Sequence, residues 1–148
     1  MLRVYLACYQ DGQRHLTLDP VLANVLARLK AQSVKVALLT NQARDTTEMT
    51  LNHLDSQEQF DLVITAQDIP QPKPAPDGIE LGLRTWRVPT RQARLIGDTQ
   101  NAIGAARTAG SDVRQAAWYL PAVLPSASYP VAGSPDAPAR YLWPKTEG

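Results

Sequence analysis

The sequence has little cysteine, little excess charge and no long apolar segment. Cys8 is its one cysteine, which excludes an intramolecular disulfide and a cysteine-rich zinc site. This usage is typical of a reducing compartment and predicts a cytoplasmic protein. Lysine and arginine number 15 against 14 aspartate and glutamate, a net charge of +1 without a basic run. We therefore expect no nucleic-acid partner and no membrane partner.

Two further absences narrow the class of protein. The apolar run over residues 1–8 is too short for a secretory signal, and no other stretch approaches the length that spans a membrane. Neither Gly-x-Gly-x-x-Gly nor Gly-x-x-x-x-Gly-Lys-Ser/Thr occurs, which argues against dinucleotide and P-loop binding. A receiver-like or nucleotide-binding α/β domain with similar strand ends remains a rival interpretation. The length predicts a single domain over residues 1–148.

Short apolar runs alternate with helical patterns along most of the chain. The runs predict strands over residues 4–8, 34–39, 60–65, 94–97 and 115–120, with a short edge strand over 139–143. Helices are predicted from Asp19-Pro20 onward and over residues 43–54, 77–86 and 102–109. This order predicts an α/β fold, a three-layer, doubly wound and mostly parallel sheet with helices on both faces.

Capping residues and apolar spacing define the helices. Asp19 and Asp77 are expected to cap the first and third helices, and Gly110 to end the last one. The predicted core contacts of the first two helices are Val21, Leu22, Val25, Leu26 and Leu29, and then Met49, Leu51 and Leu54.

The C-terminal part of the chain is rich in proline. Six of the twelve prolines lie between Pro121 and Pro144, so this part is expected to be largely irregular. Residues 121–138 are predicted to form a proline-rich loop or flap, and the segment 125–138 is expected to be either a mobile loop or a cover over a site.

Polar residues follow three of the predicted strands or lie in the loops after them. Thr40-Asn41 follows the strand over 34–39, Lys73 begins Lys73-Pro74-Ala75-Pro76, and Asp98 follows the strand over 94–97. In open α/β sheets, ligand sites form outside the carboxyl ends of the strands. A hydroxyl, an amide, an ammonium and a carboxylate at one edge can hold a phosphate and a divalent cation.

These segments, in this order and spacing, resemble motifs of the haloacid dehalogenase (HAD) superfamily of phosphatases and phosphotransferases. Thr40-Asn41 is similar to the second motif, which hydrogen-bonds the transferring phosphoryl group, and Lys73 to the third, which neutralises phosphate charge. Gly97-Asp98-Thr99 resembles the fourth motif, whose acidic residue binds magnesium. The resemblance implies Thr40 and Lys73 as catalytic residues, Thr40, Asn41 and Lys73 as substrate-binding residues, and Asp98 as a ligand of Mg²⁺.

The first motif of the family, a strand ending in Asp-x-Asp, is degenerate here. In the family its first carboxylate attacks phosphorus and its second serves as acid and base. One alignment places Tyr9 at the nucleophile position, and another places Cys8 there with Gln10 at the second Asp. Asp11 is the nearby carboxylate, and it is an acid/base, a displaced nucleophile or a turn residue before Gly12. A first motif upstream of Met1 would remove this difficulty.

Two further departures concern the metal and the shape of the site. Ala102 stands where many relatives carry a second acidic residue, so weak or absent Mg²⁺ binding is expected. The short interval between Asp11 and the first helix leaves no room for a cap domain. The resemblance thus implies a Mg²⁺-dependent phosphomonoester hydrolase that is impaired by the missing aspartate, with a small phosphorylated molecule or phosphate as ligand. The alternative is a catalytically inactive binding or scaffold protein of the same fold, and an open site makes a homodimer plausible.

Overall fold

The computed structural model describes residues 17–116 and 131–132. Its helices are α1 (Pro20–Ala31), α2 (Arg44–His53), α3 (Asp77–Trp86) and α4 (Gln100–Ala109), with short 3₁₀ turns η2 (Gln57–Gln59), η3 (Ala66–Asp68) and η4 (Thr90–Gln92). Its strands are β1 (Ala37–Leu39), β2 (Leu62–Ile64), β3 (Arg94–Gly97), β4 (Asp112–Ala116) and β5 (Val131–Ala132). The predicted strands over 4–8 and 139–143 lie outside the described residues, as do Cys8, Tyr9 and Asp11.

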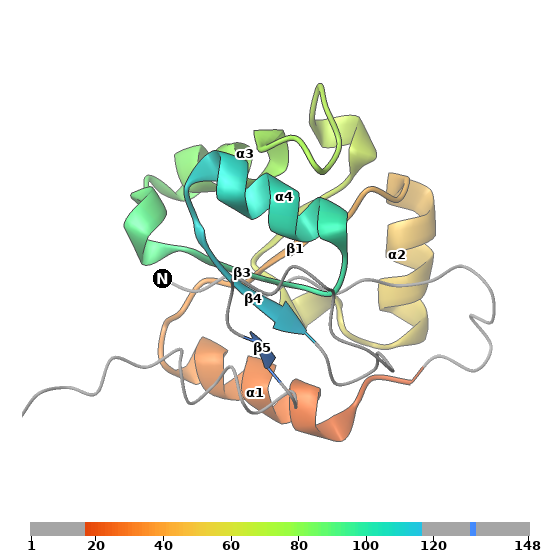
Figure 1. Ribbon diagram of the computed structural model, residues 1–148. Coiled ribbons are helices and arrows are strands. Elements are labelled where there is room, and N and C mark those ends of the chain that lie inside the picture. The colour runs from red at the N-terminus through yellow and green to blue at the C-terminus, as the bar shows by residue number, and fades with distance from the viewer. Residues whose placement is uncertain (1–16, 117–130, 133–148) are drawn as a thin grey trace, which may run out of the picture.

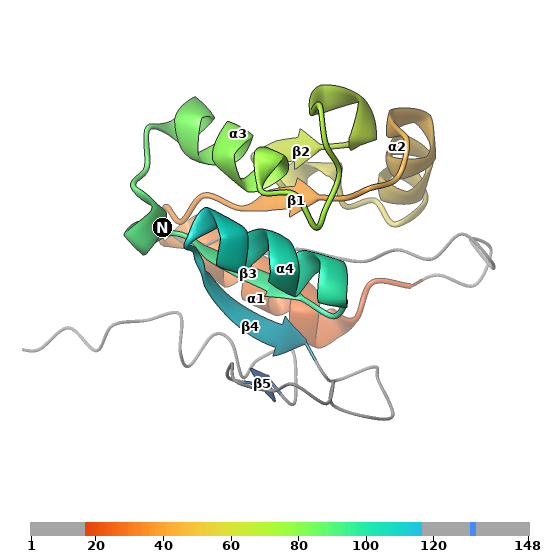
Figure 2. The same cartoon turned by 45° about the horizontal axis from the view of Figure 1, so that its top comes forward.

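All strand pairs in the described residues are parallel. β1 pairs with β2, and β3, β4 and β5 form a second group in that order. Figure 2 shows the two groups one above the other, with β1 and β2 next to α3 and with β3 and β4 next to α4. The predicted α/β fold with parallel strands is confirmed.

Two apolar cores cover opposite faces of these strands and make the three layers. One core joins α3 and α4 to residues such as Leu39 and Leu95, and the other joins α1 and α2 to Leu38 and Ile96. Because consecutive residues of β1 and of β3 enter different cores, both faces of the strands are buried, as expected for a parallel sheet. Figure 1 shows α3 and α4 on one side of the strands and α1 on the other.

Several boundaries differ from the sequence predictions. Strand β1 begins three residues later than predicted and β2 two residues later, whereas β3 matches its predicted range. β4 begins at Asp112, three residues before the predicted start at 115. The apolar pattern did not reveal this start, because Asp112 and Arg114 are polar. These two polar side chains form ion pairs, and Arg94 of β3 also binds Asp112. β5 lies within the segment predicted to be a loop, of which the other residues are outside the described part.

The helix ends obey local chemistry, with one correction. Asp19 accepts hydrogen bonds from the amides of Val21 and Leu22, and Gly110 ends α4 in the left-handed conformation, both as predicted. Asp77 is not the cap of α3 but its first residue, because Pro76 already has helical angles (φ −78°, ψ −8°). A carboxylate in the first turn still interacts favourably with the helix dipole.

Two predicted core residues are wrong. Val21 is 46% exposed and Met49 59% exposed. Val21 lies at the edge of the apolar stripe in the first turn of α1. In α2 the buried side is formed by Thr47, Thr50 and Leu51. The hydroxyl groups of the two threonines donate to carbonyl oxygens one helical turn earlier in the chain. These internal hydrogen bonds allow threonine to be buried, so Met49 turns outward.

The described residues form only the α/β layers, and no helical domain interrupts residues 17–116. None of their helices combines the length and apolarity that crossing a bilayer requires.

Candidate functional site

The end of β1 places the first predicted site residue. The Thr40 amide donates to the Ile64 carbonyl of β2 at 3.0 Å, which continues the strand pairing by one residue. The Thr40 hydroxyl oxygen accepts from the Gln42 amide at 3.1 Å, so its proton can donate elsewhere. Thr40 and Asn41 are not a helix cap, since α2 begins after Ala43 without a side-chain cap.

Lys73 is the second site residue, and it lies at the end of β1 although it is far away in sequence. Lys73 is only 4% exposed, and its side-chain ammonium group donates a hydrogen bond to the Leu39 carbonyl at 3.1 Å. Burial lowers the pKa of Lys73 to about 7, against the opposing effect of the Asp98 charge. An anion that binds next to this group would favour its charged form.

Asn41 holds the main chain of Lys73. The Asn41 side-chain amide donates to the Lys73 carbonyl at 2.9 Å, and the Lys73 amide donates back to Asn41 Oδ1 at 2.9 Å. The peptide bond between Lys73 and Pro74 is cis. The loop rests on α4, where a Cβ at Gly104 would lie 3.2 Å from the Pro74 Cβ. Lys73 is therefore fixed from the β1 side and supported from the α4 side.

Asp98 follows β3 and is the third site residue. Burial raises the pKa of its carboxyl group, while its own backbone hydrogen bond and the charge of Lys73 oppose this rise. Each of the two charges affects the pKa of the other group, because the Lys73 ammonium and the Asp98 carboxyl group lie near one another. Thr99, not Asp98, caps α4 by accepting from the Ala102 amide at 3.1 Å. The Asp98 carboxylate is thus not used as the helix cap.

Among the described residues, the feature of the site that fits a divalent cation is one carboxylate oxygen. Asp98 Oδ1 is buried and has no hydrogen-bond partner among the described residues, so it is available as one oxygen ligand. Ala102, at the position of the second acidic residue in many relatives, is fully buried in the core. Within the described ranges, no three histidine, cysteine, aspartate or glutamate side chains gather into a group that could hold a metal ion. Asp98 is the residue here that would hold Mg²⁺.

Sequence reasoning missed a network beside the site. Arg44 of α2 pairs with Asp68, and Asp68 also accepts from the amide and the hydroxyl of the fully buried Thr65. The hydrogen bond from Arg44 lowers the pKa of the Asp68 carboxyl group despite partial burial. This network ties the loop after β1 to the loop after β2. A Thr-x-x-Asp capping box at residues 65–68 was the sequence signal for it.

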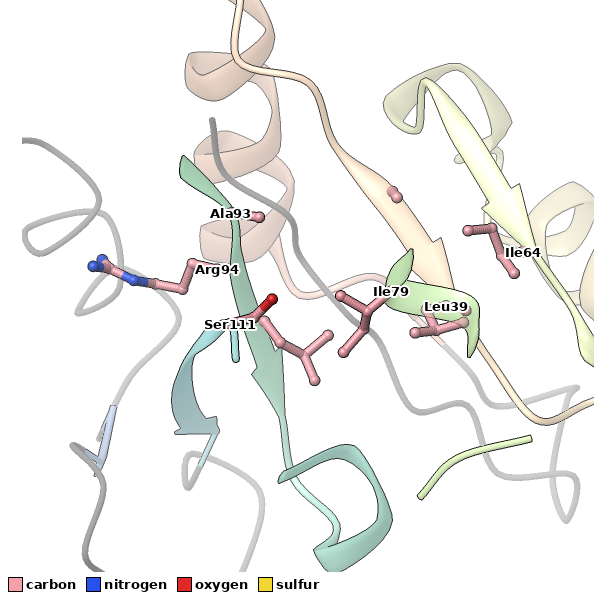
Figure 3. A pocket seen from close by; sticks show the side chains of 9 residues that line it. Leu39, Ile64, Ile79, Ala93, Arg94 and Ser111 are labelled. Atoms are coloured by element: carbon pink, nitrogen blue, oxygen red, sulfur yellow. The ribbon is translucent and has the colours of Figure 1, made fainter. Parts of the chain in front are cut away.

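An apolar pocket lies elsewhere in the molecule. It is lined by residues of the core, including Leu39, Ile79 and Leu95, and by none of the predicted site residues. Figure 3 shows the Ile79 and Leu39 side chains directed into it, while the Arg94 guanidinium points away. The pocket is a gap in the packing between β1, α3 and β3, and it offers little to a phosphate group.

Thr40 and Asp98 thus follow the carboxyl ends of β1 and β3, where α/β sheets form their ligand sites, and Lys73 joins them there. The model of the haloacid dehalogenase-like hydrolase family matches residues 1–116 of the chain. The protein belongs to this family, as its motifs predicted.

Known relatives and structures agree with this assignment. Pyrophosphatase PpaX of Bacillus cereus is 33% identical over 92 residues, 62% of this chain and 43% of the relative. The chain therefore spans less than half of that relative's length. A HAD-superfamily hydrolase from Geobacter sulfurreducens superposes with a TM-score of 0.73 at 23% identity, covering 84% of this chain and 61% of the other. The structure of CbbY from Rhodobacter sphaeroides in complex with phosphate superposes with a TM-score of 0.71 at 24% identity. The match covers 80% of this chain and 55% of the CbbY chain. These two likenesses show the fold.

Proposed function

We propose that the chain is a HAD-like phosphohydrolase domain that binds a small phosphorylated molecule and hydrolyses its phosphomonoester with Mg²⁺, at a rate reduced by the missing nucleophile. One observation carries the proposal: Lys73 is buried at the end of β1, next to Thr40 and within electrostatic reach of Asp98. A buried ammonium is costly unless an anion uses it. The crystal structure of CbbY with phosphate is of a protein with the same fold.

The chain's own residues would divide the work in the following way. The Thr40 hydroxyl donates to a phosphoryl oxygen, and the Lys73 ammonium neutralises charge on the oxygens as the phosphoryl group transfers. Asp98 would hold Mg²⁺, which supplies further neutralisation of that charge. Asp11 remains our proposed acid/base or substitute nucleophile, and it lies outside the described residues.

An inactive binding or scaffold protein is the second candidate. It is favoured by the fully buried Ala102, which leaves Asp98 without the second acidic partner that many relatives have. In this case the site keeps its affinity for phosphate and has no hydrolytic step. We also keep, as proposals, a cytoplasmic location and a homodimer.

The two functions can be separated by hydrolysis of an aryl phosphate with and without Mg²⁺. The measurement compares wild type with Asp98→Asn and Asp11→Asn, prepared in the same way. Metal-dependent turnover that is lost in Asp98→Asn supports the hydrolase, and its loss in Asp11→Asn assigns Asp11 to the reaction. Equal background rates in all three proteins, together with calorimetric binding of inorganic phosphate, support the binding protein. Wild type that neither binds nor hydrolyses contradicts both.

A further inference from the structure

Asn41 is exposed, yet its side-chain amide is occupied by the main chain of Lys73. The amide donates to the carbonyl and accepts from the N–H of that single residue, both at 2.9 Å, across 32 positions of sequence. This pattern is the reciprocal pair of hydrogen bonds that a neighbouring strand would supply. Asn41 thus bonds the main chain of a loop residue in the way that a neighbouring strand would.

The Lys73 side chain returns to the same segment. Its ammonium donates to the Leu39 carbonyl at 3.1 Å, two residues before Asn41. The residue is therefore fixed at two points, its main chain at Asn41 and its ammonium at Leu39, with Thr40 between them.

We propose that Asn41 is a positioning residue, whose amide sets the place of the Lys73 ammonium relative to the Thr40 hydroxyl. This inference rests on the proposed function, in which both groups bind one phosphoryl group. It changes the role of Asn41 that the family resemblance implied. Instead of contacting the substrate, Asn41 acts through Lys73.

The position of the Lys73 main chain matters because hydrogen-bond donors act over short distances. Hydroxyl and ammonium donors must both lie about 3 Å from the oxygens they bind. A loop that moves by 1 Å misplaces the ammonium even when the lysine itself is intact. The Gly104 contact with Pro74 supports the loop from the α4 side only, so the hydrogen bonds of Asn41 are what hold the main chain of Lys73 to the segment after β1.

The test uses Asn41→Ala and Asn41→Leu in the full chain. Leucine has the same branching at Cγ as asparagine and is larger, and it cannot form the hydrogen bonds, so it separates lost bonding from lost bulk. Asn52→Ala is the matched control, because Asn52 is also exposed and its amide contacts the Gln57 side chain in another part of the molecule. Circular dichroism and the thermal midpoint establish that each variant is folded.

Two measurements report on Lys73. The first is its rate of acylation at about pH 10, where access to the amine rather than its protonation limits the reaction. The exposed Lys30 and Lys35 serve as references in the same mass spectra. The second is the affinity for inorganic phosphate, by calorimetry. We expect both Asn41 variants to raise the acylation of Lys73 and to weaken phosphate binding, each roughly tenfold, as two lost hydrogen bonds suggest.

The outcomes separate this inference from the proposed function. Faster acylation of Lys73 in both variants, with wild type that neither binds phosphate nor hydrolyses an aryl phosphate, supports the positioning by Asn41 and overturns the proposed function. Phosphate binding by wild type, with acylation and affinity in the Asn41 variants equal to those of Asn52→Ala, overturns the positioning role alone. Recovery of wild-type values by Asn41→Leu would also overturn it, because bulk would then suffice.

Discussion

At the scale of single residues, the site concentrates groups that the fold alone would not favour. Lys73 is a buried lysine, and burial lowers its pKa to about 7 from an ordinary 10.5. Asp98 has a buried oxygen to which none of the residues in 17–116 or 131–132 donates a hydrogen bond. Such groups lower stability, and proteins retain them where they serve binding or catalysis.

Lys73→Met is expected to stabilise the protein at neutral pH by roughly 1–3 kcal/mol, because it removes a buried charge. The pH dependence follows from the lowered pKa. Below about pH 7 the amine is charged in both states, and folding bears the full cost of its desolvation. Between about 7 and 10.5 the unfolded chain holds a proton that the folded protein lacks, so the free energy of unfolding rises with pH.

Urea unfolding of wild type and Lys73→Met over this pH range checks the prediction. The rise from about pH 7 should be present in wild type and missing from the variant. A variant with the same rise would show that another group causes it.

Replacement of the buried Gln115 is expected to give a second gain in stability. It is 0% exposed, and neither polar atom of its amide has a hydrogen-bond partner within the part of the chain that the structure describes. Gln115→Met keeps the length of the side chain and removes both polar atoms, so we expect about 1–2 kcal/mol of added stability. Chemical denaturation measures it, with the exposed Gln92→Met as a control that changes little. A loss of stability would mean that the amide is bonded, for example to an ordered water molecule.

At the scale of elements, the site depends on how α3 and α4 pack on the strands. Gly78 in the first turn of α3 lies against the Leu39 side chain, and the Leu39 carbonyl is the acceptor of the Lys73 ammonium. Gly104 of α4 lies against Pro74 next to Lys73. Small residues at these two points let the helices approach the site closely.

Gly78→Ala is expected to destabilise the protein by about 1–3 kcal/mol, although alanine favours a helix. The new methyl group would overlap the Leu39 Cδ1 atom, and both residues are buried. Thermal unfolding measures the effect, with the exposed Thr85→Ala in the same helix as a control. Unchanged stability would mean that Leu39 adopts another rotamer at little cost.

At the scale of the whole molecule, two apolar cores join strands that belong to separate hydrogen-bonded groups. Leu39 of β1 and Leu95 of β3 enter one core, and Leu38 and Ile96 enter the other. The site residues after β1 and after β3 are therefore held in place by the packing of both layers. A ligand that bridges them should stabilise the folded protein as a whole.

We expect inorganic phosphate to raise the thermal midpoint of wild type and of Asn52→Ala by more than that of Lys73→Met. A ligand at a hundred times its Kd adds about 2.7 kcal/mol to the free energy of unfolding. Phosphate also stabilises proteins without binding, so the shift in Lys73→Met measures that background. Equal shifts in the three proteins would argue against a phosphate site at Lys73.

Much of the fold and part of the site could be predicted. Runs of apolar residues located the strands, and Asp19 and Gly110 marked helix ends, because these signals act between near neighbours. Thr40, Lys73 and Asp98 could be selected because each follows a strand or its loop in a known order. Met49 was placed wrongly because spacing alone does not tell which side of a polar helix is buried.

The sequence by itself determined the order of helices and strands, the family and the chemical types of the site residues. Only the tertiary structure decided that the Asn41 side chain hydrogen-bonds the main chain of Lys73. It also decided that the buried Lys73 ammonium donates to the Leu39 carbonyl. It also decided that Thr65, Asp68 and Arg44 join two loops. The physical reason is that the contacts of Lys73 with Asn41 and Leu39, and of Arg44 with Asp68, link residues more than 20 positions apart, whose distance is set by packing and not by local propensity.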